Sequence, residues 1–282
     1  MNEASTLHTL FEGFAILLGL TLGSFWNVCI ARLPERRSLW PRSGCPTCGQ
    51  AIGWYDNIPV VSWVLLGRSC RVCSAPISPS YPLIELMGGL IGWLLYRRIL
   101  PSPELLDGAH LTAWWVYMAF AGCLIVATYS DIRHRIIPDE TSLYAIPFAL
   151  VATGLLDVVD YQAWPAPGWR QGVWGAALGG GFLGAVGLAA RYVYGPDALG
   201  MGDIKLVGMI GAVLGALPGI LIVLLVASLI GAVGGLMGTL LYRRRVYPPF
   251  APALALASLA YLLLGDLWVP RLLPGLSHYF IG

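Results

Sequence analysis

Asp131 and Asp203 are carboxylates at the edges of long apolar segments. Asp131 follows one apolar run, and Asp203 ends the tetrapeptide Gly200-Met201-Gly202-Asp203 before another. Only 15 of the 282 residues are acidic. An ionisable group at a membrane boundary is costly, so each such residue is a candidate for a functional role. Two carboxylates that meet can share a proton and hold a water molecule that attacks a peptide carbonyl. The pair therefore indicates aspartyl protease chemistry.

A simpler interpretation is that both aspartates are charges at helix ends. Asp203 near a helix amino terminus would interact favourably with the helix dipole, whereas Asp131 at a carboxyl terminus would be repelled by it. The glycines of the tetrapeptide, Gly200 and Gly202, allow unusual backbone angles and close approach of another segment. Asp139 and Lys205 flank the pair, and we expect them to tune its pKa or to hold the surrounding loops.

Four cysteines form a second cluster, in the spacing Cys45-x2-Cys48 and Cys70-x2-Cys73. Two such pairs can hold one tetrahedral Zn²⁺, and four thiolates leave no open position on the metal. The alternatives are disulfides or buried thiols, but a cytoplasmic loop disfavours disulfides. A short segment with little core also gains folding free energy from a metal. The spacing predicts a structural zinc site.

The composition is that of a polytopic membrane protein. The chain is 57% hydrophobic and 11% charged, whereas a soluble domain carries about 25% charged residues. The net charge of +2 offers no basic patch for nucleic acid. Apolar runs of roughly 20 residues predict an all-α fold with about eight transmembrane helices, near residues 10–31, 81–99, 111–130, 141–158, 173–194, 204–217, 219–241 and 250–268.

Charge distribution predicts the topology and three regions. Residues 1–31 lack the basic start of a cleavable signal peptide and form the first helix, with the amino terminus outside. Residues 32–80 form the cytoplasmic cysteine loop, and residues 81–282 carry the remaining helices and the aspartates. Most of the 17 Lys and Arg residues then fall in cytoplasmic loops, with Arg97 and Arg98 as an exception. Both aspartates would lie on the cytoplasmic side.

Two polar residues interrupt apolar segments. Glu85 lies just inside the second expected span. We expect it to contact a methyl donor, a substrate amine or an arginine, or else to form a structural ion pair. Asn27 in the first span indicates an interhelical hydrogen bond.

Several segments together resemble the type IV prepilin peptidases, the bifunctional leader peptidase/N-methyltransferases of type IV pilus and type II secretion systems. The resemblance extends from about residue 10 to 245. The matching stretches are GSFWNVCIARLP at 23–34, CPTC at 45–48, WYDNIPVVSWVLLGRSCRVC at 54–73, ISPSYPLIEL at 77–86, DIRHRIIPDE at 131–140 and GMGDIK at 200–205.

This resemblance implies that Asp131 and Asp203 are the catalytic aspartates of an inner-membrane enzyme. Such an enzyme cleaves the leader of prepilins and pseudopilins at the cytoplasmic face. It then methylates the new amino terminus with S-adenosylmethionine, and the cysteine loop belongs to the form associated with methyl transfer. No stretch is a nucleotide-binding fingerprint, so the donor pocket is left unassigned.

Three alternatives stay open at this point. The first is a peptidase without methyltransferase activity, in which the zinc loop serves as a docking element. The second is a proton- or cation-coupled transporter that uses the two aspartates. The third is an assembly scaffold without catalysis. A transporter would place its carboxylates near the bilayer midplane, whereas these lie near its edge. The natural substrate, the oligomeric state, the pKa values of the pair and the choice between pilus and secretion are left open.

Overall fold

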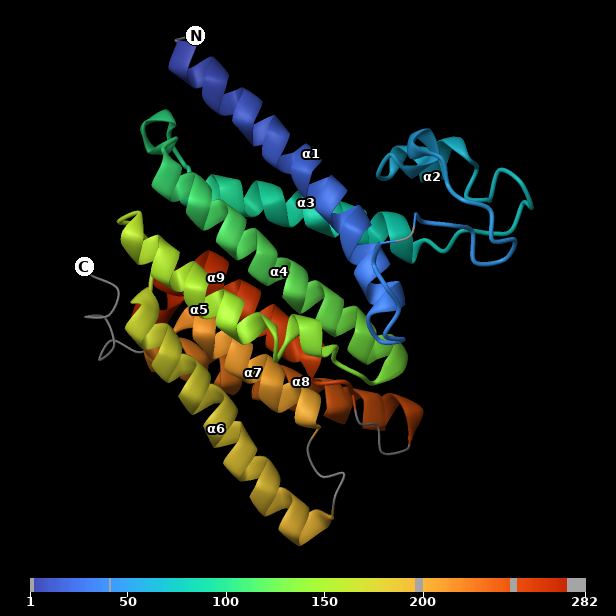
Figure 1. The fold of residues 1–282 in the computed structure, drawn as a ribbon. Helices are drawn as coiled ribbons and strands as arrows, with labels where there is room; N and C mark the ends of the chain where they lie inside the picture. The colour runs from blue at the N-terminus through green and yellow to red at the C-terminus, as the bar shows by residue number, and fades with distance from the viewer. Residues whose placement is uncertain (1–2, 41, 196–199, 244–247, 273–282) are drawn as a thin grey trace. The chain divides into compact units, whose positions relative to one another are not determined.

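The computed structural model describes residues 3–40, 42–195, 200–243 and 248–272, and in these ranges the fold is helical (Figure 1). The only β-type pairings there are two isolated bridges, Gly44 with Ala51 and Ser69 with Pro76. The chain divides into two compact units, residues 1–122 and 123–282. The boundary falls inside one helix, α4 (Gly108–His134), which contributes its first half to one unit and its second half to the other.

The first unit is built on the pair α1 (Glu3–Arg32) and α3 (Ser80–Ile99), which cross closely. Gly19 and Gly88 face each other so closely that a Cβ on either would collide with the other's backbone. Between these two helices in the sequence lies the cysteine loop, with η1 (Trp54–Asn57) and α2 (Val61–Leu65). The turn η2 (Pro103–Leu105) leads from α3 to α4.

Polar contacts also join α1 to α3. The Asn27 amide donates to the Tyr81 carbonyl at 3.0 Å, which confirms the expected interhelical hydrogen bond. At the other end of the pair, the Trp93 indole donates to Glu12 at 2.7 Å, and the Arg97 guanidinium lies 3.5 Å from the same carboxylate. Arg97, one of the arginines that the predicted topology places on the outer side, therefore has an acidic partner.

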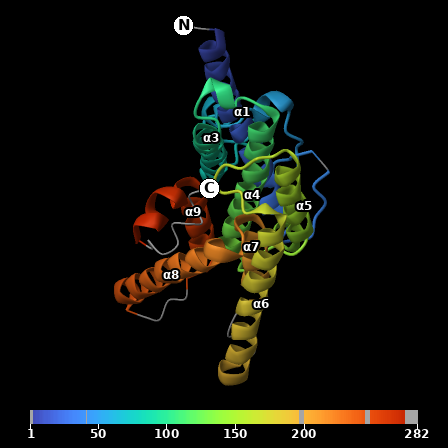
Figure 2. The same cartoon turned by 90° about the vertical axis from the view of Figure 1, so that its left-hand side faces the viewer.

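The second unit contains η3 (Asp139–Thr141), α5 (Ala145–Val158), α6 (Gly168–Tyr194), α7 (Met201–Leu214), the π-helical turn η4 (Ala216–Ile220), α8 (Leu221–Tyr242) and α9 (Ala251–Leu272). Its core is α7, which is buried continuously from Leu206 to Leu214 and packs against α6. Figure 2 shows α6 and α8 extending in different directions from the region of α7.

Close packing of α6 on α7 depends on glycines that meet backbone to backbone. A Cβ on Gly175 would collide with the Gly211 carbonyl, and a Cβ on Gly211 would collide with the Gly175 carbonyl. A Cβ on Gly179 would lie 2.8 Å from the Val207 carbonyl oxygen. Small residues thus allow the backbones of α6 and α7 to approach closely, as they do at helix contacts in membrane proteins.

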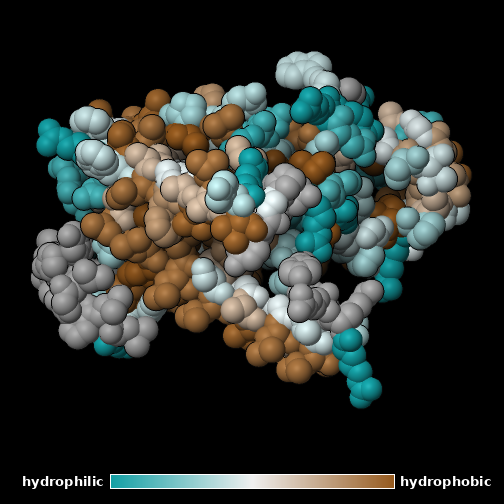
Figure 3. Space-filling view, turned by 90° about the horizontal axis from the view of Figure 1, so that it is seen from below, coloured by the Kyte–Doolittle hydropathy of each residue, from teal (hydrophilic) through white to brown (hydrophobic). Residues whose placement is uncertain are grey.

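Each of the eight expected spans corresponds to a helix, but the count of eight spans is not confirmed. Six helical segments of the described chain are long and apolar enough to cross a membrane, which makes this a multi-pass membrane protein. The other two are α3, which carries Glu85, Arg97 and Arg98 in its 20 residues, and α7. With 14 residues, α7 is about 21 Å long, short of a hydrocarbon core of about 30 Å. Apolar side chains cover much of the molecular face in Figure 3.

Candidate active site and metal centre

Asp131 lies in the last turn of α4 and is 9% exposed. The backbone N–H of Ala251, the first residue of α9, donates to its Oδ2 at 3.3 Å. The carboxylate therefore faces the positive end of α9, which offsets the repulsion expected from the carboxyl end of its own helix. Sequence reasoning missed Ala251, because a backbone donor leaves no signal in residue type.

Asp203 lies in the first turn of α7 and is partly buried. The charge of Asp131 acts electrostatically on the Asp203 carboxyl, so the two groups lie within range of each other. Both belong to the second unit, although 71 residues separate them in sequence. Two carboxyls in this relation cannot both ionise readily, and one of them tends to keep a proton.

Two contacts join the start of α7 to the loop that follows Asp131. Lys205 Nζ lies 2.7 Å from Asp139 Oδ1, so these two flanking residues pair with each other. A Cβ on Gly202 would lie 3.0 Å from Ile137 Cβ, so the helix approaches the loop closely at this glycine. Lys205, Asp139 and Gly202 thus hold together the two segments that carry the aspartates.

Gly200 has an ordinary extended backbone, with φ −67° and ψ 129°, as the residue preceding α7. Gly200 therefore does not adopt the unusual backbone angles that the sequence allowed. A Cβ at Gly200 would lie 3.1 Å from Asp203 Oδ2. This glycine therefore leaves space beside the carboxylate rather than supplying a special turn.

The loop after α4 is shaped by hydrogen bonds to one carbonyl. The hydroxyls of Thr141 and Ser142 donate to the Pro138 carbonyl at 3.0 and 2.9 Å, respectively. Both side chains are buried. These bonds fix the turn that places Asp139 opposite Lys205.

The four loop cysteines converge in the first unit. Their Sγ atoms all lie within 4.8 Å of one another, and Cys45 Sγ lies 3.7 Å from Cys73 Sγ. Tetrahedral zinc with Zn–S bonds of about 2.3 Å requires sulfur separations of about 3.8 Å. The cluster fits a zinc site with four cysteine ligands, and all four thiols are free of disulfides.

The two cysteine pairs adopt the same local structure. Cys45 N–H donates to the Gln50 carbonyl and Gly49 N–H to the Cys45 carbonyl, both at 2.9 Å; Cys70 and Ser74 repeat the pattern at 2.8 and 2.9 Å, with Ala75 as acceptor for Cys70. Gly49 and Ser74 have positive φ, 70° and 57°. Each turn directs its two sulfurs to one point.

Backbone donors prepare these thiols for a metal. The N–H groups of Cys48 and Thr47 donate to Cys45 and lower its pKa to about 6. The N–H groups of Cys73 and Val72 similarly lower the pKa of Cys70. Because zinc binds the thiolate rather than the thiol, these bonds favour the metal-binding form.

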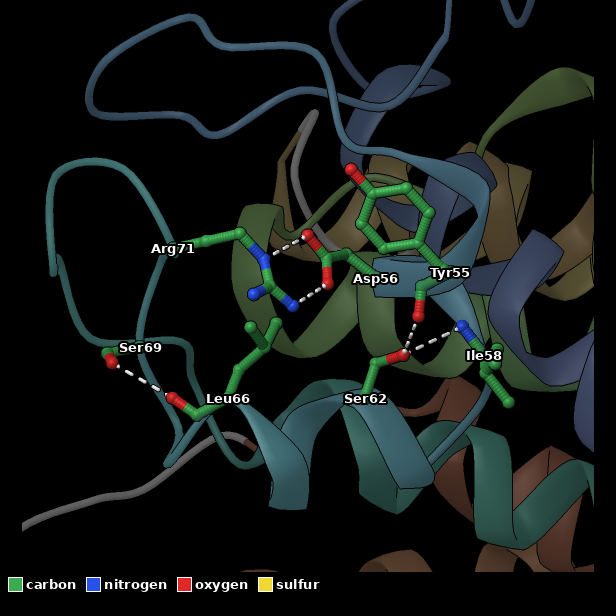
Figure 4. Close-up of polar contacts among 7 residues, drawn as sticks. All are labelled: Tyr55, Asp56, Ile58, Ser62, Leu66, Ser69 and Arg71. Atoms are coloured by element: carbon green, nitrogen blue, oxygen red, sulfur yellow. Dashed lines mark hydrogen bonds and ion pairs between the residues drawn. The ribbon is translucent and has the colours of Figure 1, made fainter.

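A second set of contacts orders the rest of the loop (Figure 4). Arg71, between Cys70 and Cys73, forms a bidentate pair with Asp56 at 2.8 and 2.6 Å. The hydrogen bonds to Arg71 lower the pKa of Asp56. The Ser62 hydroxyl accepts from Ile58 N–H at 2.9 Å and donates to the Tyr55 carbonyl at 3.0 Å.

Within the part of the chain that the structure describes, Glu85 forms no ion pair with an arginine. Its Oε2 accepts the Val60 N–H at 2.7 Å, and Ser24 on α1 forms a side-chain hydrogen bond to the same carboxyl group. Glu85 belongs to the first unit with the cysteine loop, and the aspartates belong to the second. The structural ion pair considered for Glu85 is replaced by these two hydrogen bonds.

Two family descriptions match the chain. Residues 17–99 match the Bacterial Peptidase A24 N-terminal domain, and residues 118–236 match the Type IV leader peptidase family. The first match includes the cysteine loop and Glu85, and the second includes both aspartates.

Curated relatives share much of the sequence, and several carry the name prepilin leader peptidase/N-methyltransferase. One from Aeromonas hydrophila is 34% identical over 94% of this chain and 95% of its own length. One from Klebsiella pneumoniae is 36% identical over 74% of this chain and 88% of its own. One from Myxococcus xanthus is 38% identical over 73% of this chain and 56% of its own. No solved structure matches the chain significantly. The chain thus belongs to the type IV leader peptidase family.

Proposed function

We propose that this protein removes the leader peptide from prepilins or pseudopilins and then N-methylates the new amino terminus. The observation that carries the proposal is that Asp131, at the end of α4, and Asp203, at the start of α7, lie near enough for their charges to interact. The names of the relatives support the substrate and both activities.

In the proposed cleavage, the two aspartates share one proton and hold a water molecule. The ionised carboxylate takes a proton from the water as its oxygen attacks the scissile carbonyl. The protonated carboxyl donates a hydrogen bond to that carbonyl, and a proton then passes to the departing amine. The Ala251 N–H supports the ionised form on Asp131, so we assign the base to Asp131 and the acid to Asp203.

The cysteine loop serves methyl transfer in this proposal. Cys45, Cys48, Cys70 and Cys73 would hold Zn²⁺, which stabilises the loop and has no open position for substrate. S-adenosylmethionine would supply an electrophilic methyl group for the amine that cleavage exposes. In this proposal the ordered loop forms part of the site where the methyl donor meets the amine.

We also propose a bacterial inner-membrane location with the aspartates and the cysteine loop at the cytoplasmic face. The arginines that follow α1 and α4 support this orientation. A prepilin awaiting cleavage presents its leader on that side, and the methyl donor is cytoplasmic as well.

The test uses purified protein in detergent, a prepilin and labelled S-adenosylmethionine. Wild type is compared with Asp131→Asn and Asp203→Asn, and mass spectrometry reports leader loss and addition of one methyl group. We expect wild type to do both and each variant to leave the leader attached. Cleavage by either variant would refute the assignment of the aspartates, and cleavage without methylation by wild type would support a peptidase only.

A further inference from the structure

Val60 has a backbone conformation that valine rarely adopts. Its φ is 63° and its ψ is −49°, and Val61 N–H donates to the Pro59 carbonyl at 2.6 Å. These values describe a γ-turn with positive φ, which is strained, and a β-branched side chain adds to the strain. Such a turn persists only where the surrounding structure enforces it, and such sites cluster at functional positions.

The buried carboxylate of Glu85 enforces this turn. Glu85 is 9% exposed, and its Oε2 accepts the N–H of the strained residue itself at 2.7 Å. Ser24 holds the same carboxyl group from α1. A Cβ on Gly23 would lie 2.7 Å from Glu85 Cα, so α1 and α3 are in close contact at this point. The acceptor is therefore fixed by two packed helices.

The Val60 turn leads directly into the ordered part of the cysteine loop. Val61 begins α2, and the Trp63 indole donates to the Ile77 carbonyl at 3.1 Å, next to the point where the loop returns to α3. The Arg71–Asp56 pair joins the second cysteine pair to η1, just before the turn. Residues 54–73 are thus tied to one another, and the bond from Val60 to Glu85 attaches them to the helices.

We propose that Glu85 is a positioning residue for methyl transfer, acting as the hydrogen-bond acceptor that holds the Val60 turn and so orients the cysteine loop on α1 and α3. This inference rests on the proposed bifunctional activity. It assigns Glu85 no contact with the reacting atoms. Leader cleavage, whose aspartates lie in the other compact unit, does not depend on it.

The proposal requires the acceptor oxygen of Glu85 but not its negative charge, and two substitutions test these properties separately. Glu85→Gln keeps an oxygen for the Val60 N–H and gains an N–H₂ that can donate to the Ser24 hydroxyl. Glu85→Leu has a similar size but no acceptor. Val60→Gly keeps the backbone N–H and adopts positive φ without a Cβ clash, so its turn needs less support.

The experiment uses the full chain in nanodiscs and compares wild type, Glu85→Gln, Glu85→Leu, Val60→Gly and the double variant Val60→Gly/Glu85→Leu. Leader cleavage is measured on a prepilin, and methylation is measured separately on a pilin already cleaved. Backbone hydrogen exchange of residues 58–66 measures the stability of the turn independently of enzymatic activity. Zinc content is measured for each variant.

We expect Glu85→Leu to slow methylation by about ten- to a hundredfold, the scale of a misplacement near 1 Å, with cleavage within about twofold of wild type. Glu85→Gln should methylate within about threefold of wild type. The double variant should recover part of the loss, because the two sites are coupled. Exchange in residues 58–66 should rise in Glu85→Leu and stay at the wild-type level in Glu85→Gln.

Loss of methylation in Glu85→Gln equal to that in Glu85→Leu would overturn the proposal, because the charge itself would then be required. Full methylation by Glu85→Leu, or equal loss of cleavage and methylation in it, would overturn it as well. If wild type cleaves but methylates no pilin, the proposed bifunctional activity fails. In that case unchanged exchange in Glu85→Leu would separately refute the role of Glu85 in holding the turn.

Discussion

The cysteine loop and the aspartate region are stabilised by different means. Among the described residues of 33–79, only Cys45 and Ser62 are buried, and order comes from individual hydrogen bonds, two ion pairs and a site for a metal. In the second unit, α7 is buried from Leu206 to Leu214 and meets α6 through glycines. The loop should therefore be sensitive to loss of a ligand or an acceptor, and the aspartate region to added volume.

The largest effect should come from adding one methyl group at Gly211. Its Cβ would collide with the Gly175 carbonyl, and backbone cannot move aside as a flexible side chain can. We expect Gly211→Ala to lower the unfolding free energy by about 3 kcal/mol and to abolish cleavage. The matched control is Gly181→Ala on α6, where nothing lies within 4 Å of the added Cβ. Thermal unfolding in detergent and a cleavage assay would show the difference.

Removing one zinc ligand should impair methylation, which we assign to the cysteine loop, without impairing cleavage, which we assign to the aspartate region. Cys45→Ser leaves three sulfurs, so we expect loss of bound zinc and a fall in methylation of at least about thirtyfold, since metal binding and loop folding are coupled. Cleavage should stay within about twofold of wild type. Cys123→Ser, a cysteine outside the cluster, is the control. Metal analysis would measure the bound zinc, and separate assays would measure cleavage and methylation. Equal loss of both activities would contradict the assignment of the loop to methylation alone.

The backbone donor to Asp131 allows a test within the aspartate region. Ala251→Pro removes the N–H at the first position of α9, where proline is well tolerated. We expect cleavage kcat to fall by about tenfold, the value of one hydrogen bond to a charged group. Ala251→Gly, which keeps the N–H, should retain more than half of the activity. Similar kcat values for the two variants would exclude a role for this donor.

The smallest effect should come from the Lys205–Asp139 pair. Its side chains are 27% and 40% exposed, and such pairs contribute roughly 0.2–1 kcal/mol. Lys205→Met should therefore lower cleavage by no more than about fivefold, and Lys205→Arg should lower it less. High salt should narrow the gap between wild type and Lys205→Met, as measured by cleavage rates. A hundredfold loss would indicate direct contact of Lys205 with substrate.

The chemical groups of both regions could be predicted from the sequence because residue type and spacing carry them. Two C-x2-C pairs specify a tetrahedral ligand set, and carboxylates at the edges of apolar runs are rare enough to be singled out. Helix positions followed from apolar length. The predicted count of eight membrane spans is not confirmed, because α3 carries three charged residues and α7 has only 14 residues.

The supporting contacts could not be predicted, because they involve backbone atoms. Ala251 and Val60 act through their N–H groups, which every residue except proline has. The pairing of Lys205 with Asp139 required knowing that α7 begins beside the loop after α4. For Glu85, the sequence indicated a buried acid but not that its partner is a strained turn.

Enclosure of α7 has a consequence for how this protein responds to its lipid environment. A helix that touches acyl chains must tilt, or thin the bilayer, when its length differs from the bilayer thickness. From Leu206 onward α7 is covered by protein, so hydrophobic mismatch does not act on it directly. Lipids of different acyl length should alter the tilt of the exposed helices α6 and α8 while leaving the depth of Asp203 within its own unit unchanged.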